Sequence, residues 1–517
     1  MTKNAQNSKP SPLVILGIDA GDPALIHRWA AEGVLPNLSA LMERGCWGET
    51  HSPELVSEHG VWLSLFSGKS RAQHGYYYFR QLKPGTYDLE AKTGMEIDAP
   101  PFWTLWTGRE DRKAAIVDAP DEGVREGLPG LQLVNWASHH NWDPTRYPTG
   151  ASSEALLREI QSQYGEREIT PENANSTWEE DLAIYRDLLP RIRNKGKVCR
   201  DLFTREPFDL CVTVFAESHA ASHQFWPYCP EVPANADKEP NELTHALRTV
   251  YQTVDEEIGK ILEALPENAN IVITSSVGMA DDYPMTGISD AFFHKLGYAH
   301  RPPQGPPTRS PMDLARRILP ESWRIAISRR LFSRDQREKL LADQFRNGKD
   351  WSRTRAFALP SAYTTFVRVN LRGREPMGIV EPGEAYDELL DEIEKEFRAL
   401  RDPVSGEPAV AGIHRTATLF GCGPHPVLPD LFVDWRPGRY MDKVEHPQGE
   451  ITQDKPDFFR RSDHSFQGFF AAAGPGISAQ GKLEGIEILD LAPTFLQLLG
   501  ETQPEYMKGR PLPILTP

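Results

Sequence analysis

The sequence predicts an α/β protein in which a doubly wound, mostly parallel sheet is covered by helices on both faces. Two observations indicate this class: apolar segments of strand length alternate with helical segments, and polar residues follow directly after the predicted strands. Alternation of strands with helices favours parallel pairing. Open α/β sheets bind their ligands beyond the carboxyl ends of the strands. We therefore expect an α/β/α sandwich with its functional residues at one edge of the sheet.

Four apolar segments are predicted to be buried strands. The first is LVILGI at residues 13–18, and DLCVTVF follows at residues 209–215. Two more are expected at residues 271–274 and 468–473. None of them alternates apolar with polar residues, which is typical of strands that are covered on both faces.

Helices are predicted between these strands. The segment 36–43 begins with Pro36 and is followed by Gly45, residues that are common at the start and the end of a helix. The clearest helical pattern covers residues 243–265, where apolar residues recur at intervals of three and four. Two further helices are expected at residues 22–31 and 488–500.

Two long segments interrupt the alternation, at about residues 76–200 and 281–350. The first is rich in Trp, Pro and Gly, and the second contains the Pro-rich RPPQGPPTRSP and a basic stretch. We expect one domain spanning residues 1–517, with these segments as inserted cap regions or a partner surface. The basic stretch could contact a membrane or a protein, but a solvated helical face is the commoner role of such a charge run.

Composition excludes several classes of function. The chain has 57 basic and 73 acidic residues and a formal charge of −16, which disfavours nucleic acid and anionic membranes as partners. Its five cysteines are scattered without a CxxC pair, so neither a disulfide framework nor a cysteine zinc site is expected. With no signal-like segment and no apolar run of about 20 residues, we expect a cytoplasmic enzyme. The oligomeric state is left open.

The sharpest chemical signal is a pair of histidines directly after the strand at 209–215. His219 and His223 are spaced i and i+4, so on a helix both imidazoles lie on one face and can reach one ion. Neutral imidazole is a common ligand for zinc and similar metals. The alternative is a pair of exposed helix histidines without a ligand.

Three other segments contain residues that are candidates for the functional edge of the sheet. Asp19 follows the first strand, where a carboxylate serves a metal or caps the next helix. His464 lies in a loop before a strand and could complete a site or be a surface residue. Ser57-Glu58-His59 suggests a catalytic triad, but such triads normally draw on separate segments. Ser57 could instead be a nucleophile activated by a metal, which needs no base.

These segments together resemble the alkaline phosphatase superfamily, most of all its type I phosphodiesterase/nucleotide pyrophosphatase branch, which includes predicted phosphohydrolases and phosphomutases. The resemblance covers roughly residues 13–512 in order, through VILGIDAGD, WLSLFSGKSRAQHGYY, FAESHAASHQFW, DHSFQGFFAAAGPGI and MKGRPL. It implies a sandwich of alkaline phosphatase type with two metals, usually zinc, about 4 Å apart. It also implies a Thr or Ser nucleophile and a covalent intermediate.

The resemblance carries over residue by residue. Asp19 matches the first metal-binding aspartate, and His223 matches the histidine of an Asp-x-x-x-His motif in which His219 replaces the aspartate. His464 matches the C-terminal ligand histidine. The expected metal ligands are therefore Asp19, His219, His223 and His464, and three imidazoles with one open position suit a catalytic zinc ion.

The chain also departs from the pattern. Where the family has the aspartate and histidine of its second metal site, this sequence has Ser276 and Val277. The second site is therefore expected to be degenerate, unless Asp281 and Asp282 substitute. Counting back from Ser67-Gly68 places Glu58 at the nucleophile position. If the alignment with the family pattern is shifted by one residue, Ser57 is the catalytic nucleophile. If it is not shifted, water attacks directly or a carboxylate takes the place of the nucleophile.

The expected function is a metal-dependent hydrolase or transferase of small-molecule phosphate mono- or diesters, with a divalent ion, most simply zinc, as the cofactor. One alternative is a catalytically impaired relative that acts as a metal-stabilised binding protein, suggested by Ser276 and Val277. Another is a hydrolase of a different tetrahedral ester, such as a sulfate or a phosphonate.

Overall fold

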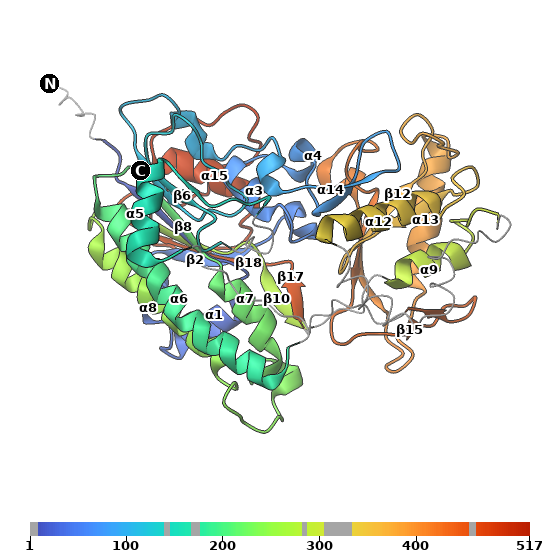
Figure 1. The fold of residues 1–517 in the computed structure, drawn as a ribbon, viewed down its shortest axis with the longest axis horizontal. Helices are drawn as coiled ribbons and strands as arrows, with labels where there is room; N and C mark the ends of the chain where they lie inside the picture. The colour runs from blue at the N-terminus through green and yellow to red at the C-terminus, as the bar shows by residue number, and fades with distance from the viewer. Residues whose placement is uncertain are drawn as a thin grey trace. The chain divides into compact units, whose positions relative to one another are not determined.

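The protein folds as two compact units (Figure 1). The computed structural model describes residues 9–138, 145–166, 176–281, 287–303, 333–453 and 462–516. The first unit comprises Met1–Tyr76, Thr93–Asp281 and Arg460–Pro517. The second comprises Tyr77–Lys92 and Asp282–Phe459. Within the described ranges, no helix is long and apolar enough to cross a membrane.

This division differs from the single domain with insertions at about 76–200 and 281–350 that the sequence suggests. Most of the first segment belongs to the main unit, where it supplies the sheet strands β5 (Ala114–Val117) and β6 (Gly130–Val134). These strands are only four and five residues long, which is too short for a clear periodicity. The second unit extends to Phe459, well beyond residue 350. The basic stretch lies mostly outside the described residues.

The first unit contains a nine-stranded sheet, counted over the residues that the structure describes. The strand order is β19-β2-β18-β9-β1-β8-β5-β6-β7. At its centre β1 (Leu13–Ile18) lies between β8 (Leu210–Phe215) and β9 (Asn270–Thr274), parallel to both. The remaining strands are β2 (Cys46–Thr50), β7 (Gly150–Ala151), β18 (Gly468–Ala473) and β19 (Gly481–Lys482). Every residue of β1, β8, β9 and β18 is buried, which confirms the four predicted strands.

Helices cover both faces of this sheet, so the doubly wound α/β/α sandwich is confirmed (Figure 1). One side carries α1 (Pro23–Ala31), α6 (Trp178–Thr204) and α8 (Ala246–Ala264), and the other α3 (Val61–Ser67) and α15 (Ile488–Leu498). The unit also contains α2 (Pro36–Arg44), α4 (Arg71–His74), α5 (Glu154–Tyr164) and α7 (Glu217–Phe225). All four helices predicted from periodicity are present within three residues of their expected ends.

The second unit is built on a four-stranded antiparallel sheet of order β11-β12-β14-β13. Its strands are β11 (Ala356–Leu359), β12 (Thr365–Val369), β13 (Val410–Arg415) and β14 (Leu431–Trp435). Its helices are α9 (Gly287–Lys295), α12 (Arg334–Asn347), α13 (Glu384–Arg398) and α14 (Thr416–Phe420). Two small hairpins pair β3 (Arg80–Leu82) with β4 (Leu89–Ala91) and β15 (Lys443–Val444) with β16 (Ile451–Thr452). The Phe292 and Phe397 rings stack in its core with centroids 4.1 Å apart.

A short ladder in the first unit lies where the chain leaves that unit after Asp281 and returns to it at Arg460. Strand β10 (Gly278–Asp281) pairs antiparallel with β17 (Ser462–Ser465). Asp281 lies opposite Ser462, and Met279 lies opposite His464. The ladder therefore places His464 just beyond the carboxyl end of β9.

Candidate metal centre

Helix α7 positions the first two histidines. It begins at Glu217, one residue after Ala216 and two after the end of β8, so it starts at the carboxyl edge of the sheet. His219 and His223 are 7% and 6% exposed, and every other residue of the helix is also buried. The alternative of two exposed helix histidines therefore does not describe this pair.

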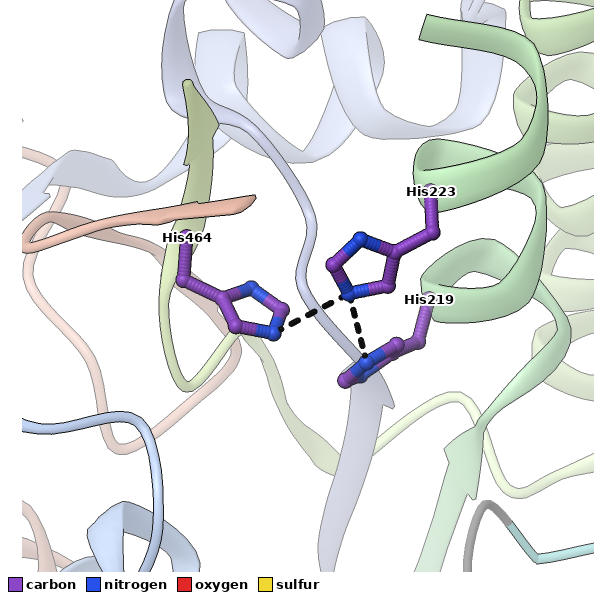
Figure 2. Close-up of side chains that lie close together, drawn as sticks. All are labelled: His219, His223 and His464. Carbon is purple, nitrogen blue, oxygen red and sulfur yellow. Dashed lines mark hydrogen bonds between the residues drawn. The ribbon is translucent and has the colours of Figure 1, made fainter. Parts of the chain in front are cut away.

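The third histidine comes from the other end of the chain and faces the first two (Figure 2). His464 Nε2 lies 3.2 Å from His223 Nε2, which lies 3.1 Å from His219 Nε2. One ring nitrogen of each histidine lies within 4.8 Å of those of the other two, and all three residues are buried. Among the described residues, these histidines are the group with the arrangement to hold a metal ion.

The contacts of the three Nδ1 atoms indicate which ring nitrogen of each histidine carries the proton. His219 Nδ1 lies 3.1 Å from Asp19 Oδ2, His223 Nδ1 lies 3.2 Å from the Ser462 carbonyl, and His464 Nδ1 lies 3.4 Å from the Gly278 carbonyl. Each of these oxygens is an acceptor, so the network assigns the proton of each ring to Nδ1. The three Nε2 lone pairs then point at one another.

A cation between the Nε2 atoms relieves the repulsion of these lone pairs. Zinc bonds of about 2.0–2.1 Å in a tetrahedral site place neighbouring nitrogens about 3.3–3.4 Å apart. The separations of 3.1 and 3.2 Å that His223 makes are close to that value. The three histidines therefore fit a divalent ion with an open position.

Asp19 lies behind His219 and does not join the three Nε2 atoms. Its Oδ2 accepts from His219, while its Oδ1 accepts from Trp62 Nε1 at 2.8 Å and from Ser276 Oγ at 3.1 Å. Its backbone carbonyl accepts from Ser218 Oγ at 2.7 Å, which ties the loop after β1 to α7. Asp22, three residues on, is the residue that caps α1, through its bond from Leu25 N.

The Ser57-Glu58-His59 segment forms a linear chain of contacts and not a catalytic triad. Ser57 is fully buried, and its Oγ lies 3.5 Å from Glu58 Oε2. Glu58 Oε1 in turn lies 2.7 Å from His59 Nδ1. In a triad the histidine stands between serine and acid, whereas here the acid stands in the middle. Burial favours a raised pKa for Glu58, but the charge and hydrogen bond of His59, together with His464, lower that pKa, which makes Glu58 a weak base.

Arg71 holds this segment in place and was not singled out from the sequence. Its fully buried guanidinium donates to the carbonyl oxygens of Ser57 at 2.9 Å, His59 at 2.6 Å and Tyr76 at 2.8 Å, and also to that of Glu54. The local sequence signals only the helix start that precedes it, through the capping box of Ser70 and Gln73.

A second buried network supports the same segment. Ser64 Oγ donates to Glu54 Oε2 at 3.0 Å and lies 2.9 Å from His74 Nε2. Because the Tyr76 amide donates to His74 Nδ1, the His74 proton lies on Nε2 and points at Ser64. Burial raises the pKa of Glu54 to about 7 and lowers the pKa of His74 well below its usual value. The network therefore consists of neutral groups in mildly acidic solution.

Asp281, one of the two possible substitute ligands, is not part of the cluster. Asp281 Oδ1 accepts from Trp226 Nε1 at 2.9 Å, and Asp282 lies outside the described residues. Val277 is buried and offers no ligand atom. The second site therefore gains no replacement ligand from Asp281 in this structure.

Sequence comparison places the chain among known enzymes. Residues 13–321 match the model of the type I phosphodiesterase / nucleotide pyrophosphatase family. The protein belongs to this family of phosphoric ester hydrolases, within the alkaline phosphatase superfamily. No curated protein matches the sequence.

Solved structures match the chain at low sequence identity. Phosphonoacetate hydrolase from Sinorhizobium meliloti, in complex with phosphonoformate, is 15% identical with a TM-score of 0.52, over 95% of this chain and 96% of that one. Inactive murine ectonucleotide pyrophosphatase/phosphodiesterase 5 in complex with AMP is 13% identical with a TM-score of 0.47, over 95% and 96%. The human counterpart is 11% identical with a TM-score of 0.46, over 96% of each chain.

Proposed function

We propose that the protein is a divalent-metal-dependent hydrolase of small-molecule phosphate mono- or diesters. The observation that carries the proposal is the convergence of three Nε2 atoms, from His219, His223 and His464, at the carboxyl edge of β8. Zinc is the ion proposed, because buried imidazoles with an open position are a ligand set that it favours. When bound there, such an ion polarises a phosphoryl oxygen and acidifies water.

The residues of the chain have separate roles in this proposal. His219, His223 and His464 hold the ion, and Ser57 is the proposed nucleophile. Its Oγ would form a bond to phosphorus as the ester oxygen leaves, and the hydroxyl proton would pass to that departing oxygen, because Glu58 beside Ser57 is a weak base. Hydrolysis of the resulting serine phosphate by water would return the enzyme to its starting state. Direct attack by water is the competing route, and it needs no covalent intermediate.

A second role is favoured by a specific observation. Ser276 and Val277 stand where the family pattern has metal ligands, and Ser57 is fully buried. A protein with these features could keep one ion for stability and bind a phosphate-bearing molecule without turning it over. Sulfate and phosphonate esters are further substrates of the same tetrahedral geometry and belong in the same assay.

Turnover of aryl phosphate monoesters and diesters, with zinc, manganese or magnesium added, tests the proposal. Aryl sulfate and phosphonate esters extend the series. The matched variants are His223→Ala, which removes the central histidine of the cluster, and His245→Ala, an exposed histidine at the start of α8. We expect turnover in the unmodified protein and in His245→Ala but not in His223→Ala. Equal rates in all three proteins, or no turnover with any metal, would contradict the proposal.

A further inference from the structure

The carboxylate of Asp19 is already engaged by donors from three separate segments. Trp62 Nε1 and Ser276 Oγ both donate to Oδ1, and His219 Nδ1 donates to Oδ2. An indole N–H is a donor only, so the Trp62 side chain directs a partial positive charge at the oxygen it contacts. Asp19 is 4% exposed, Ser276 is 4% exposed and Trp62 is 6% exposed. These contacts are therefore shielded from water.

A second divalent ion does not fit beside this carboxylate. Such an ion would have to displace the Trp62 and Ser276 donors from Oδ1, and its other family ligands are replaced by Ser276 and Val277. The valine is 2% exposed and has no lone pair to offer. The residues at this position therefore form a hydrogen-bonded support in place of a metal site.

The contact between Asp19 and His219 gives this support a role. A metal-bound histidine commonly donates its other N–H to a carboxylate, which fixes the orientation of the ring and makes it a better ligand. His219 stands where the family pattern has an aspartate, so the ligand itself is neutral. Asp19 supplies a negative charge behind this ligand, because its Oδ2 accepts a hydrogen bond of 3.1 Å from His219 Nδ1.

We propose that this protein binds a single ion, and that Asp19 is a positioning residue that acts on that ion through His219. Trp62 and Ser276 hold Asp19 in the orientation that reaches His219 and occupy the place of a second ion. The inference rests on the metal centre of the proposed function but does not depend on turnover.

Metal content of the unmodified protein is the first test. The protein is stripped of metal, loaded with excess zinc, freed of loose ions and measured by mass spectrometry for zinc per chain. We expect one ion per chain. Two ions per chain would overturn the inference, and no bound ion would overturn both it and the proposed metal centre. This measurement requires no variant to fold.

Zinc affinity of Asp19 variants tests the positioning role. Loss of such an outer carboxylate typically weakens metal binding by about 10–100-fold. We expect a loss of this size in Asp19→Ala with the count still at one ion, and a smaller loss in Asp19→Asn, which keeps a carbonyl acceptor for His219. His245→Ala, at an exposed histidine at the start of α8, is the control, with an affinity close to that of the unmodified protein.

The opposite pattern identifies a dinuclear centre. If Asp19 were a ligand of a second ion, Asp19→Ala would lower the count from two to one and leave the tighter site unchanged. Turnover is read separately: one ion without phosphoester hydrolysis would leave the inference standing and defeat the proposed function. Phosphoester hydrolysis by a protein that binds two ions would support the proposed function and overturn the single-ion inference.

Discussion

The buried guanidinium of Arg71 donates to the carbonyl oxygen of Ser57 across 2.9 Å. The same group donates to the carbonyls of His59 and Tyr76, so one side chain links the backbone before α3 to the backbone after α4. The position of the proposed nucleophile therefore depends on a residue that is not expected to touch substrate.

Removal of this guanidinium should destabilise the fold strongly. Arg71→Ala leaves several buried carbonyls without a donor, and each unsatisfied group costs about 1–3 kcal/mol. We expect the free energy of unfolding in urea to fall by at least about 3 kcal/mol. The control is Arg28→Ala, which removes an exposed pair with Glu32 and should change stability by less than about 1 kcal/mol. Similar losses in the two variants would contradict this reading of Arg71.

The raised pKa of Glu54 predicts a stability that falls as the pH rises. Burial favours the protonated form in the folded protein, where the pKa is about 7 against an ordinary value of 4.5. The contribution is therefore fully present below the unfolded pKa and is lost as the pH rises through about 7. The difference corresponds to about 3 kcal/mol at most.

Glu54→Gln isolates this effect, because a neutral amide keeps an oxygen acceptor for Ser64 and Arg71. The free energy of unfolding of the variant relative to the unmodified protein should rise between about pH 5 and about pH 8. Urea titrations at several pH values measure it. A difference that stays constant across this range would show that Glu54 does not carry the effect.

A buried ion pair between α6 and the end of β5 predicts a non-additive double mutant. Lys195 Nζ lies 3.4 Å from Asp118 Oδ2, and both side chains are fully buried. Lys195→Met leaves the Asp118 carboxylate without its cation and should cost about 3–5 kcal/mol. Adding Asp118→Asn removes the stranded charge, so the double variant should be more stable than Lys195→Met alone. Simple addition of the two single losses would contradict the coupling.

Trapping of a reaction intermediate separates the two routes of attack. If Ser57 is the nucleophile, acid quenching during turnover should leave a phosphoryl group on the peptide that contains Ser57, as read by mass spectrometry. Ser57→Ala should abolish both the modified peptide and turnover. Full activity in Ser57→Ala, with no modified peptide in either protein, would favour direct attack by water.

The fold class predicted from the sequence is confirmed, whereas the roles of the predicted site residues stay predictions. Strands such as 13–18 are apolar throughout because both faces of the sheet are covered, and this pattern is readable without a structure. The spacing of His219 and His223 is readable for the same reason, since it follows from helix geometry. His464 could be linked to them only through a family resemblance, because a ladder between residues far apart in sequence brings it into place.

Other features of the site depend on where side chains and backbone carbonyls point, which cannot be read from the sequence. The place of Asp19 after a strand left two roles open, and the family resemblance implied a metal ligand, which stays a prediction. The structure adds that its carboxylate contacts Trp62 and Ser276 as well as His219. The role of Arg71 depends on four backbone carbonyls, and backbone groups leave no residue-type signal. Residues 76–200 were interpreted as an insertion because β5 and β6 are too short to show periodicity.

The β10–β17 ladder has a consequence for how the protein is made. Two of the three histidines precede the longer segment of the second unit, Asp282–Phe459, and the third follows it, so His223 and His464 are 241 residues apart in the chain. Closing so long a loop is not prohibitive, since each doubling of loop length adds only about 0.6 kcal/mol. The complete three-histidine centre, however, cannot form during synthesis until the chain has emerged from the ribosome as far as His464. Capture of an ion by all three histidines would thus mark a polypeptide that extends beyond β17, and one that terminates before His464 would lack that centre.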